Sequence, residues 1–93
     1  MNRVQYLFNL LSEEASEVAQ NASKCIRFTP FHKSPKYTEN NIERLQTEIT
    51  DFVTIIQMLE EELRHKFDMT PSEDKRERVE QYYEISRQLG TVK

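Results

Sequence analysis

The sequence predicts an all-α fold, in which a long antiparallel helical hairpin is followed by a third, C-terminal helix. Apolar residues recur at three- and four-residue steps over two long segments, which is the period of an amphipathic helix, and no alternating strand pattern is evident. Only one glycine and three prolines occur in 93 residues, and 31% of the residues are charged. This composition is typical of long, well-solvated helices with few turns.

The length indicates a single domain over residues 1–93. A chain of this size buries only about 60% or slightly more of its unfolded surface. We therefore expect oligomerisation to complete the bundle.

The first helix is expected from Arg3 to Cys25 or Arg27. Its predicted core stripe, centred near Val4, Ala15 and Ala22, comprises Val4, Leu7, Phe8, Leu11, Ala15, Val18, Ala19, Ala22 and Ile26. Two prolines then break the pattern, which predicts a loop or ordered lid over residues 28–38. The basic and aromatic residues of this loop are Phe31, His32, Lys33, Lys36 and Tyr37.

The second helix is expected to start between Thr38 and Asn41 and to end near Lys66 or Phe67. Asn40 followed by Glu43 has the spacing of a capping box, with Thr38 as an equal candidate for the cap. The apolar positions of this helix are Ile42, Leu45, Ile49, Phe52, Val53, Ile56, Leu59 and Leu63.

The third helix has the clearest predicted start. Thr70-Pro71-Ser72-Glu73 fits a capping box with proline at the first helical position, and Gly90 is placed as a C-terminal stop. One face of this helix carries Val79, Tyr82, Tyr83, Ser86 and Leu89, and we expect the two tyrosines to pack the helix.

Composition excludes several classes of function. The net charge of −3 gives no reason to expect nucleic-acid binding. The apolar runs are far shorter than the roughly 20 residues that span a bilayer, so we expect no membrane partner. Cys25 is the only cysteine, which excludes an intrachain disulfide, argues against a zinc site and fits a reduced, cytoplasmic setting.

Two pairs of acidic residues are the strongest functional signal. Glu14 and Glu17 form one pair and Glu48 and Asp51 the other, and the i, i+3 spacing places each pair on one helix face. Glu48 falls inside the apolar arc of its helix, a local conflict of the kind that marks functional sites. At 1.5 Å per residue, Glu17 lies about 16 Å before the loop and Glu48 about 12 Å after it, so the pairs can face each other.

Such a cluster needs compensation. Two carboxylates about 6 Å apart repel by roughly 3 kcal/mol at an effective dielectric constant of 20. Protonation or a metal ion relieves that repulsion, and ligands that are all oxygen select a hard cation such as Mg²⁺ or Mn²⁺. The alternative is a set of solvated surface acids, which is common in a chain with 16 acidic residues.

The acid pairs and their flanking residues form an EExxE…ExxD motif. Its halves are Glu13-Glu14-Ala15-Ser16-Glu17, followed by Ser23-Lys24-Cys25-Ile26-Arg27-Phe28, and Glu48-Ile49-Thr50-Asp51. Over about residues 4–65 the chain resembles the MazG-like all-α nucleoside triphosphate pyrophosphohydrolases, a superfamily that also includes dimeric dUTPases and phosphoribosyl-ATP pyrophosphohydrolases.

The resemblance implies Mg²⁺-dependent hydrolysis between the α- and β-phosphates, which yields a nucleoside monophosphate and pyrophosphate. It also implies a homodimer or homotetramer. The positions that match the metal ligands are Glu14, Glu17, Glu48 and Asp51. Glu13 or one of the ligand carboxylates is then the candidate base, and the choice between them stays open.

Three residues beyond the acid pairs are candidates for substrate contacts. Lys24 lies seven residues after Glu17 and so returns to the same helix face, where it can reach phosphate oxygens. Arg27 is the next candidate, because its planar guanidinium suits phosphate. Asn21, one turn beyond Glu17, is a third candidate for phosphate or sugar.

The chain departs from some relatives at positions that concern the base. Ile55 stands where some dCTP-type relatives carry tyrosine, and the chain has no tryptophan. The candidates for base stacking are Phe8, Phe31 and Tyr37, although Phe8 is expected in the core. The alternatives to the enzyme are a non-catalytic helical interaction module and a relative that binds nucleotide without turnover.

Overall fold

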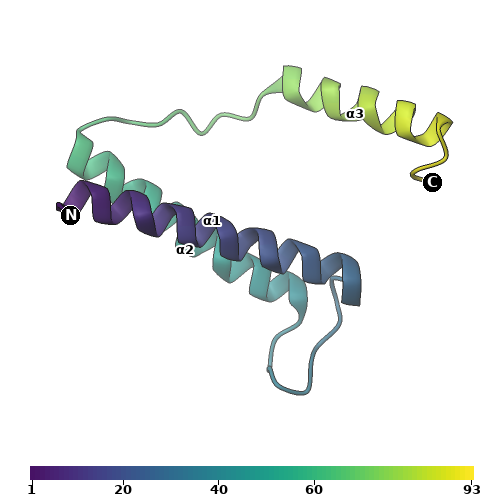
Figure 1. Cartoon of the computed structure of the whole chain (residues 1–93), viewed down its shortest axis with the longest axis horizontal. Coiled ribbons are helices and arrows are strands. Elements are labelled where there is room, and N and C mark those ends of the chain that lie inside the picture. Colours follow the sequence, from purple (N-terminus) through teal and green to yellow (C-terminus); the bar gives the residue numbers. More distant parts are fainter.

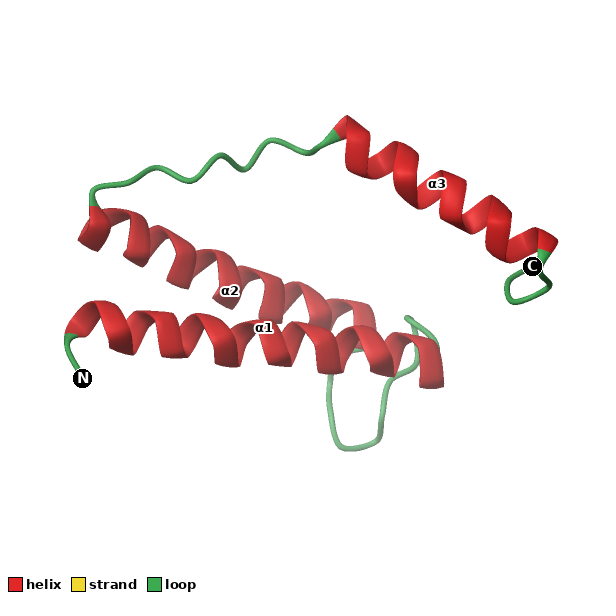
Figure 2. Ribbon diagram, turned by 45° about the horizontal axis from the view of Figure 1, so that its top comes forward, coloured by secondary structure: helices red, strands yellow, loops and turns green.

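The computed structural model describes residues 1–93 and contains three helices and no strand: α1 (Arg3–Phe28), α2 (Asn41–Leu63) and α3 (Glu73–Gln88). α1 and α2 run antiparallel beside each other, and α3 stands apart at the end of an extended connection (Figures 1 and 2). The all-α prediction and the long hairpin are confirmed. None of the helices combines the length and the apolar character that crossing a bilayer requires.

The hairpin closes along a seam in which inward-facing residues alternate at three- and four-residue steps, as in a coiled coil. The α1 positions of the seam are Val4, Leu7, Leu11, Glu14, Val18, Asn21 and Cys25. Those of α2 are Asn41, Leu45, Glu48, Phe52, Ile55 and Leu59. All are buried or half-buried, but only Leu7 and Leu59 are fully buried apolar side chains.

The predicted stripe of α1 was wrong about which apolar residues face α2. Ala15, Ala19 and Ala22 are exposed, and Phe8, expected in the core, is 47% exposed. The reason is that α1 carries apolar residues on two adjacent faces, and a stripe drawn over both is centred between them. α2 covers only the face that contains Leu7, Leu11 and Val18.

One side of the hairpin, here called the apolar face, carries a row of apolar residues from each helix. Its α1 members are the exposed Phe8, Ala15, Ala19, Ala22 and Ile26, and its α2 members are the exposed Ile42, Ile49 and Leu63 and the half-buried Ile56. At about 100° per residue, each row lies roughly 70–95° from the seam in the same rotational sense. In an antiparallel helix pair, two rows that are displaced from the seam in the same rotational sense lie on the same side of the pair. Glu17 and Asp51 are displaced in the opposite sense and therefore lie on the other side.

Capping residues set the starts of the first two helices. Asn40 is the N-cap of α2: its side-chain oxygen accepts from the Glu43 backbone N–H at 2.9 Å, and the Glu43 carboxylate accepts from the Asn40 N–H at 3.2 Å. This confirms the predicted capping box and settles the choice against Thr38. Asn2 and Gln5 form the same arrangement at the start of α1.

α2 ends at Leu63, so the prediction that it continues to Lys66 or Phe67 was wrong. Arg64 adopts a left-handed conformation with φ of 51°, and its backbone N–H donates to the Glu60 carbonyl. The Glu60 carboxylate accepts from the Phe67 N–H at 2.8 Å and pairs with Lys66 at 3.8 Å. Glu60 therefore holds the chain in a non-helical turn where a further turn of helix was expected.

The start of α3 also differs from the prediction. Ser72, not Thr70, is the N-cap, and its hydroxyl accepts from the Lys75 N–H at 3.1 Å. Pro71 thus precedes the helix, where its restricted φ suits extended backbone. Gly90 does end the helical segment, with φ of 81°, as predicted.

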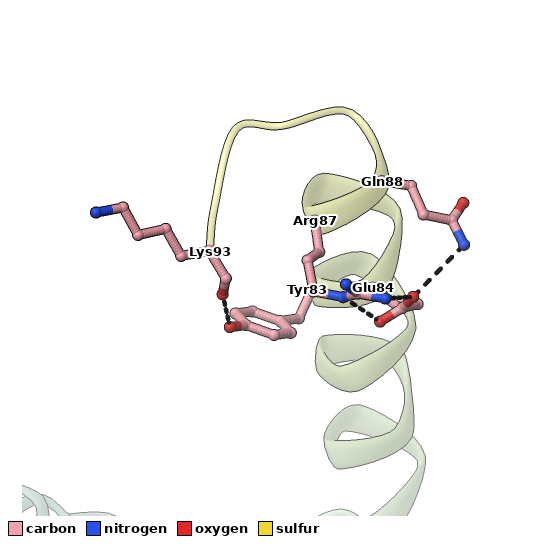
Figure 3. Close-up of polar contacts among 5 residues, drawn as sticks. All are labelled: Tyr83, Glu84, Arg87, Gln88 and Lys93. Carbon is pink, nitrogen blue, oxygen red and sulfur yellow. Dashed lines mark hydrogen bonds and ion pairs between the residues drawn. The ribbon is translucent and has the colours of Figure 1, made fainter.

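α3 is held together locally. Figure 3 shows Glu84 accepting from Arg87 at 3.0 and 2.6 Å and from Gln88, while the Tyr83 hydroxyl donates to the Lys93 carbonyl. No residue of α3 is buried or contacts the hairpin, so the expected packing of Tyr82 and Tyr83 does not occur within the chain. The radius of gyration is 17.0 Å, against about 12 Å for a compact domain of this length.

Leu59→Ala is expected to destabilise the hairpin by about 2–5 kcal/mol, because it opens a cavity at one of the two fully buried apolar side chains. Denaturant unfolding followed by circular dichroism measures the loss. Leu89→Ala is the matched control: Leu89, the C-cap residue that follows α3, is 74% exposed, so we expect a change within about 0.5 kcal/mol. Equal effects of the two substitutions would contradict this description of the core.

Candidate metal centre

The register of the hairpin places the acidic residues opposite one another. Arg3 pairs with Glu62 at 2.5 Å where the two helices begin and end. At the other end, the Asn41 side chain donates to the Thr29 carbonyl at 3.0 Å. Between these two ties, Glu14 of α1 lies across the seam from α2.

Three carboxylates converge there. One oxygen from each of Glu14, Glu48 and Asp51 lies within 4.8 Å of the others. Glu14 and Glu48 are half-buried seam residues, and Asp51 is exposed beside them. The sequence predicted Glu48 inside the apolar arc, and the structure places it there; Glu14, expected at the border of the stripe, also lies in the seam.

The cluster raises the pKa of its half-buried members. For Glu14 the causes are loss of hydration, then the charges of Asp51, Glu17 and Glu13. For Glu48 the causes are loss of hydration, then the charges of Glu17, Asp51 and Glu14. None of the four salt bridges of the chain involves these carboxylates. Clustered carboxylate oxygens that pair with no lysine or arginine side chain suit a hard divalent metal ion.

The remaining predicted acids lie at the margin of the cluster. Glu17 is exposed and outside the group of three, yet its charge is the largest one acting on Glu48. Glu13 is exposed and has the weakest of the effects on Glu14. The structure thus brings three of the four predicted ligands together, with Glu17 close enough to act on them electrostatically.

Asn21 lies in the seam one turn beyond Glu17. It is only 4% exposed, and its side-chain nitrogen donates to the Glu17 carbonyl at 3.0 Å. Its side-chain oxygen is buried without a partner, an arrangement that costs about 1–3 kcal/mol. Asn21 therefore offers one unused acceptor beside the acidic cluster.

A basic cavity of about 220 Å³ adjoins the cluster at the loop end of the hairpin. It is lined by Lys24, Phe28, His32, Ser34, Tyr37, Asn41 and Arg44. Backbone bonds from Asn41 to the His32 carbonyl (3.1 Å) and from Ile42 to the Pro30 carbonyl (2.9 Å) fasten the loop to the start of α2. The loop is thereby held over the end of the seam.

Only one of the predicted substrate-binding residues lines this cavity. Lys24 lines it, whereas Arg27 lies outside it and stacks on Phe28 with the guanidinium carbon 5.3 Å from the ring centre. Sequence reasoning missed Arg44, which stacks over Tyr37 at 3.6 Å. The available signal was spacing: Arg44 precedes Glu48 by one helical turn on the same side of α2.

Tyr37 and Arg44 connect the two parts of the site. Both also line a second cavity of about 210 Å³ together with Glu48. Hydrogen bonding and charge from Arg44 lower the pKa of the Tyr37 phenol, and Lys36 and Lys24 lower it further. An acidic cluster and a cationic, aromatic cavity thus lie side by side on the face opposite the apolar face, an arrangement that can hold a metal ion and a phosphate chain together.

Comparison of the chain with protein-family models, with curated proteins and with solved structures gave no match.

Glu48→Gln is expected to flatten the pH dependence of stability without metal. Because the folded-state pKa values of Glu14 and Glu48 are raised, the folded protein binds more protons than the unfolded chain in the mildly acidic range, and stability falls as pH rises through it. Melting temperatures in chelator at about pH 5 and about pH 7.5 test this. Glu61→Gln, an exposed α2 acid without a salt bridge, is the control and should leave the wild-type slope unchanged.

Proposed function

We propose that the chain is a Mg²⁺-dependent nucleotide pyrophosphohydrolase that converts nucleoside or deoxynucleoside triphosphates to the monophosphate and pyrophosphate. The observation that carries the proposal is the convergence of Glu14, Glu48 and Asp51 within 4.8 Å. Two of these acids occupy seam positions that packing alone would fill with apolar side chains. The neighbouring cationic cavity supports phosphate as the ligand.

Each residue then has a defined task. Glu14, Glu48 and Asp51, with Glu17 at their edge, would hold Mg²⁺, and Mn²⁺ suits the same oxygen ligands. A bound divalent ion supplies charge neutralisation on the phosphates and acidifies water. Glu13, or a carboxylate of the cluster that is not saturated by metal, accepts the proton of the attacking water. Lys24, and more distantly Arg27, neutralise phosphate oxygens, whereas the unused Asn21 acceptor is buried and would contact a sugar hydroxyl only if the seam opened there.

The proposal includes a homo-oligomer. The chain exposes 7657 Å², whereas a compact monomer of 11.2 kDa exposes about 5,700 Å². The excess of about 2,000 Å² exceeds the roughly 800 Å² that each partner buries in a standard interface. A second copy on the apolar face makes a four-helix bundle and a homodimer, and the exposed apolar residues of α3 allow further association into a homotetramer. The unpaired Cys25 suits a cytoplasmic setting.

The second candidate function is a non-catalytic interaction module, with a nucleotide-binding relative as its variant. The apolar face and the unpacked α3 favour an interaction role. This reading leaves the acidic seam without a purpose, since a partner surface gains nothing from half-buried, uncompensated Glu14 and Glu48. The enzyme hypothesis explains both the acidic cluster and the apolar face, whereas the interaction-module hypothesis explains only the apolar face.

Purified protein is expected to release pyrophosphate from at least one member of a nucleoside triphosphate panel when Mg²⁺ is present, and to stop in chelator. Glu48→Gln should lower the rate on the order of 100-fold or more, the scale seen when a group that stabilises transition-state charge is lost. Glu61→Gln should retain activity. Absence of pyrophosphate release for every triphosphate, together with no Mg²⁺-dependent rise in melting temperature, would remove the enzyme from consideration.

Phe8→Asp is expected to shift the protein toward monomer, because it puts a charge into the apolar face at a residue that is 47% exposed in the single chain. Size-exclusion chromatography with light scattering measures the mass. Asn9→Asp adds the same charge at an exposed neighbour outside the apolar face and should leave the oligomer intact. A monomeric wild-type protein at micromolar concentration would refute the oligomer.

A further inference from the structure

We infer that the basic cavity binds the diphosphate end of the substrate, the β- and γ-phosphates that leave as pyrophosphate, and that Arg44, oriented by Tyr37, is its principal ligand. This inference rests on the proposed function, because it takes a nucleoside triphosphate as the substrate. It assigns a role to Arg44 and Tyr37, which the acidic motif does not include. It also assigns a direction to the substrate across the site.

Stacking prepares Arg44 for an anion. Its guanidinium carbon lies 3.6 Å from the centre of the Tyr37 ring, a distance at which the planar group lies on the ring face. Stacking uses the face of the guanidinium, and the N–H groups along its edge that do not donate to the Tyr37 phenol remain available. A fixed guanidinium with free edge donors is suited to bidentate contact with phosphate oxygens.

Neither cation of the cavity forms a salt bridge, although Glu39 and Glu48 line the second cavity together with Arg44. Arg44 and Lys24 take part in none of the four salt bridges, although the chain has more acids than bases. No carboxylate lines the cavity, and its other polar residues are His32, Ser34 and Asn41. Two unpaired positive charges around about 220 Å³ select an anion with more than one negative charge over a neutral sugar or base.

The basic cavity and the acidic cluster have neighbouring turns of α2 in common. Arg44 is one turn from Glu48 along α2, a rise of about 6 Å. Arg44 and Tyr37 line both this cavity and the second cavity, which Glu48 and Glu39 also line, so the two residues lie between Lys24 on one side and Glu48 on the other. A phosphate chain that meets the metal at the carboxylates extends into the cavity with its most highly charged end, and the nucleoside points the other way.

The test is a calorimetric titration of the protein with inorganic pyrophosphate in chelator, which makes binding independent of metal and of turnover. We expect binding by the wild type and a loss on the order of 10-fold for Arg44→Gln and for Lys24→Gln, each of which removes one charged hydrogen-bond donor. Lys33→Gln removes a charge from the same loop outside the cavity and should bind as the wild type does. Tyr37→Leu keeps every charge but removes the ring, and should weaken binding severalfold. Circular dichroism checks that each variant is folded.

Parallel titrations with a nucleoside triphosphate, a nucleoside monophosphate and a nucleoside separate the possible sources of the phosphate signal. Pyrophosphate and the triphosphate should compete for one site, with the monophosphate at least 10-fold weaker. Monophosphate or nucleoside binding that equals pyrophosphate binding and depends on Arg44 would overturn the inference by placing the nucleoside in the cavity. So would equal effects of Lys33→Gln and Arg44→Gln.

These outcomes are distinguishable from failure of the proposed function. A protein without hydrolase activity that still binds pyrophosphate through Arg44 retains the cavity assignment and loses only the reaction. An active enzyme in which Arg44→Gln leaves pyrophosphate binding unchanged retains the reaction and loses the assignment.

Discussion

The structure depends on the antiparallel register of α1 and α2 along one seam. With Leu7 and Leu59 as the only fully buried apolar side chains, little else in the chain fixes how the helices meet. The Arg3–Glu62 ion pair and the Asn41–Thr29 hydrogen bond tie the two ends. A shift by one helical turn would separate Glu14 from Glu48 and Asp51 by about 6 Å and dismantle the acidic cluster. The acidic cluster therefore exists only in this register of the two helices.

Polar residues in the seam lower the stability of the hairpin and favour one alignment of the two helices over others. Buried polar groups at such positions fix register in coiled coils, because other alignments leave them unpaired. Asn41 acts in this way through Thr29. Glu14 and Glu48 are different, because loss of hydration in the seam, followed by the charges of neighbouring carboxylates, raises the pKa of both side chains. A seam that retains such a pair without a cation is consistent with stability given up for a ligand site.

The sequence predicted the features that follow from helical periodicity and missed those that depend on how separate segments pack together. The hairpin, the Asn40 cap and the place of Glu48 in the apolar arc all follow from spacing at 3.6 residues per turn, and the structure has each of them. The face of α1 was misplaced because two apolar rows lie side by side, and only the position of α2 separates them. Arg44 was missed because an arginine between acids resembles surface charge until Tyr37, from an aperiodic loop, is found against it.

The division of the hairpin into two faces bears on how such a small chain could be both an enzyme and an oligomer. Glu17 and Asp51 rotate to one side of the seam, and Phe8 and Ile49 rotate to the other. In the proposed dimer, association through the apolar face would add the burial that the single chain lacks and would leave the acidic cluster and the basic cavity open to the proposed substrate. It would also hold α1 and α2 together from the side opposite the site, against the mutual repulsion of the clustered carboxylates. The second copy would then stabilise the register on which the proposed site depends, so loss of the dimer would weaken the proposed metal binding even though no ligand residue is changed.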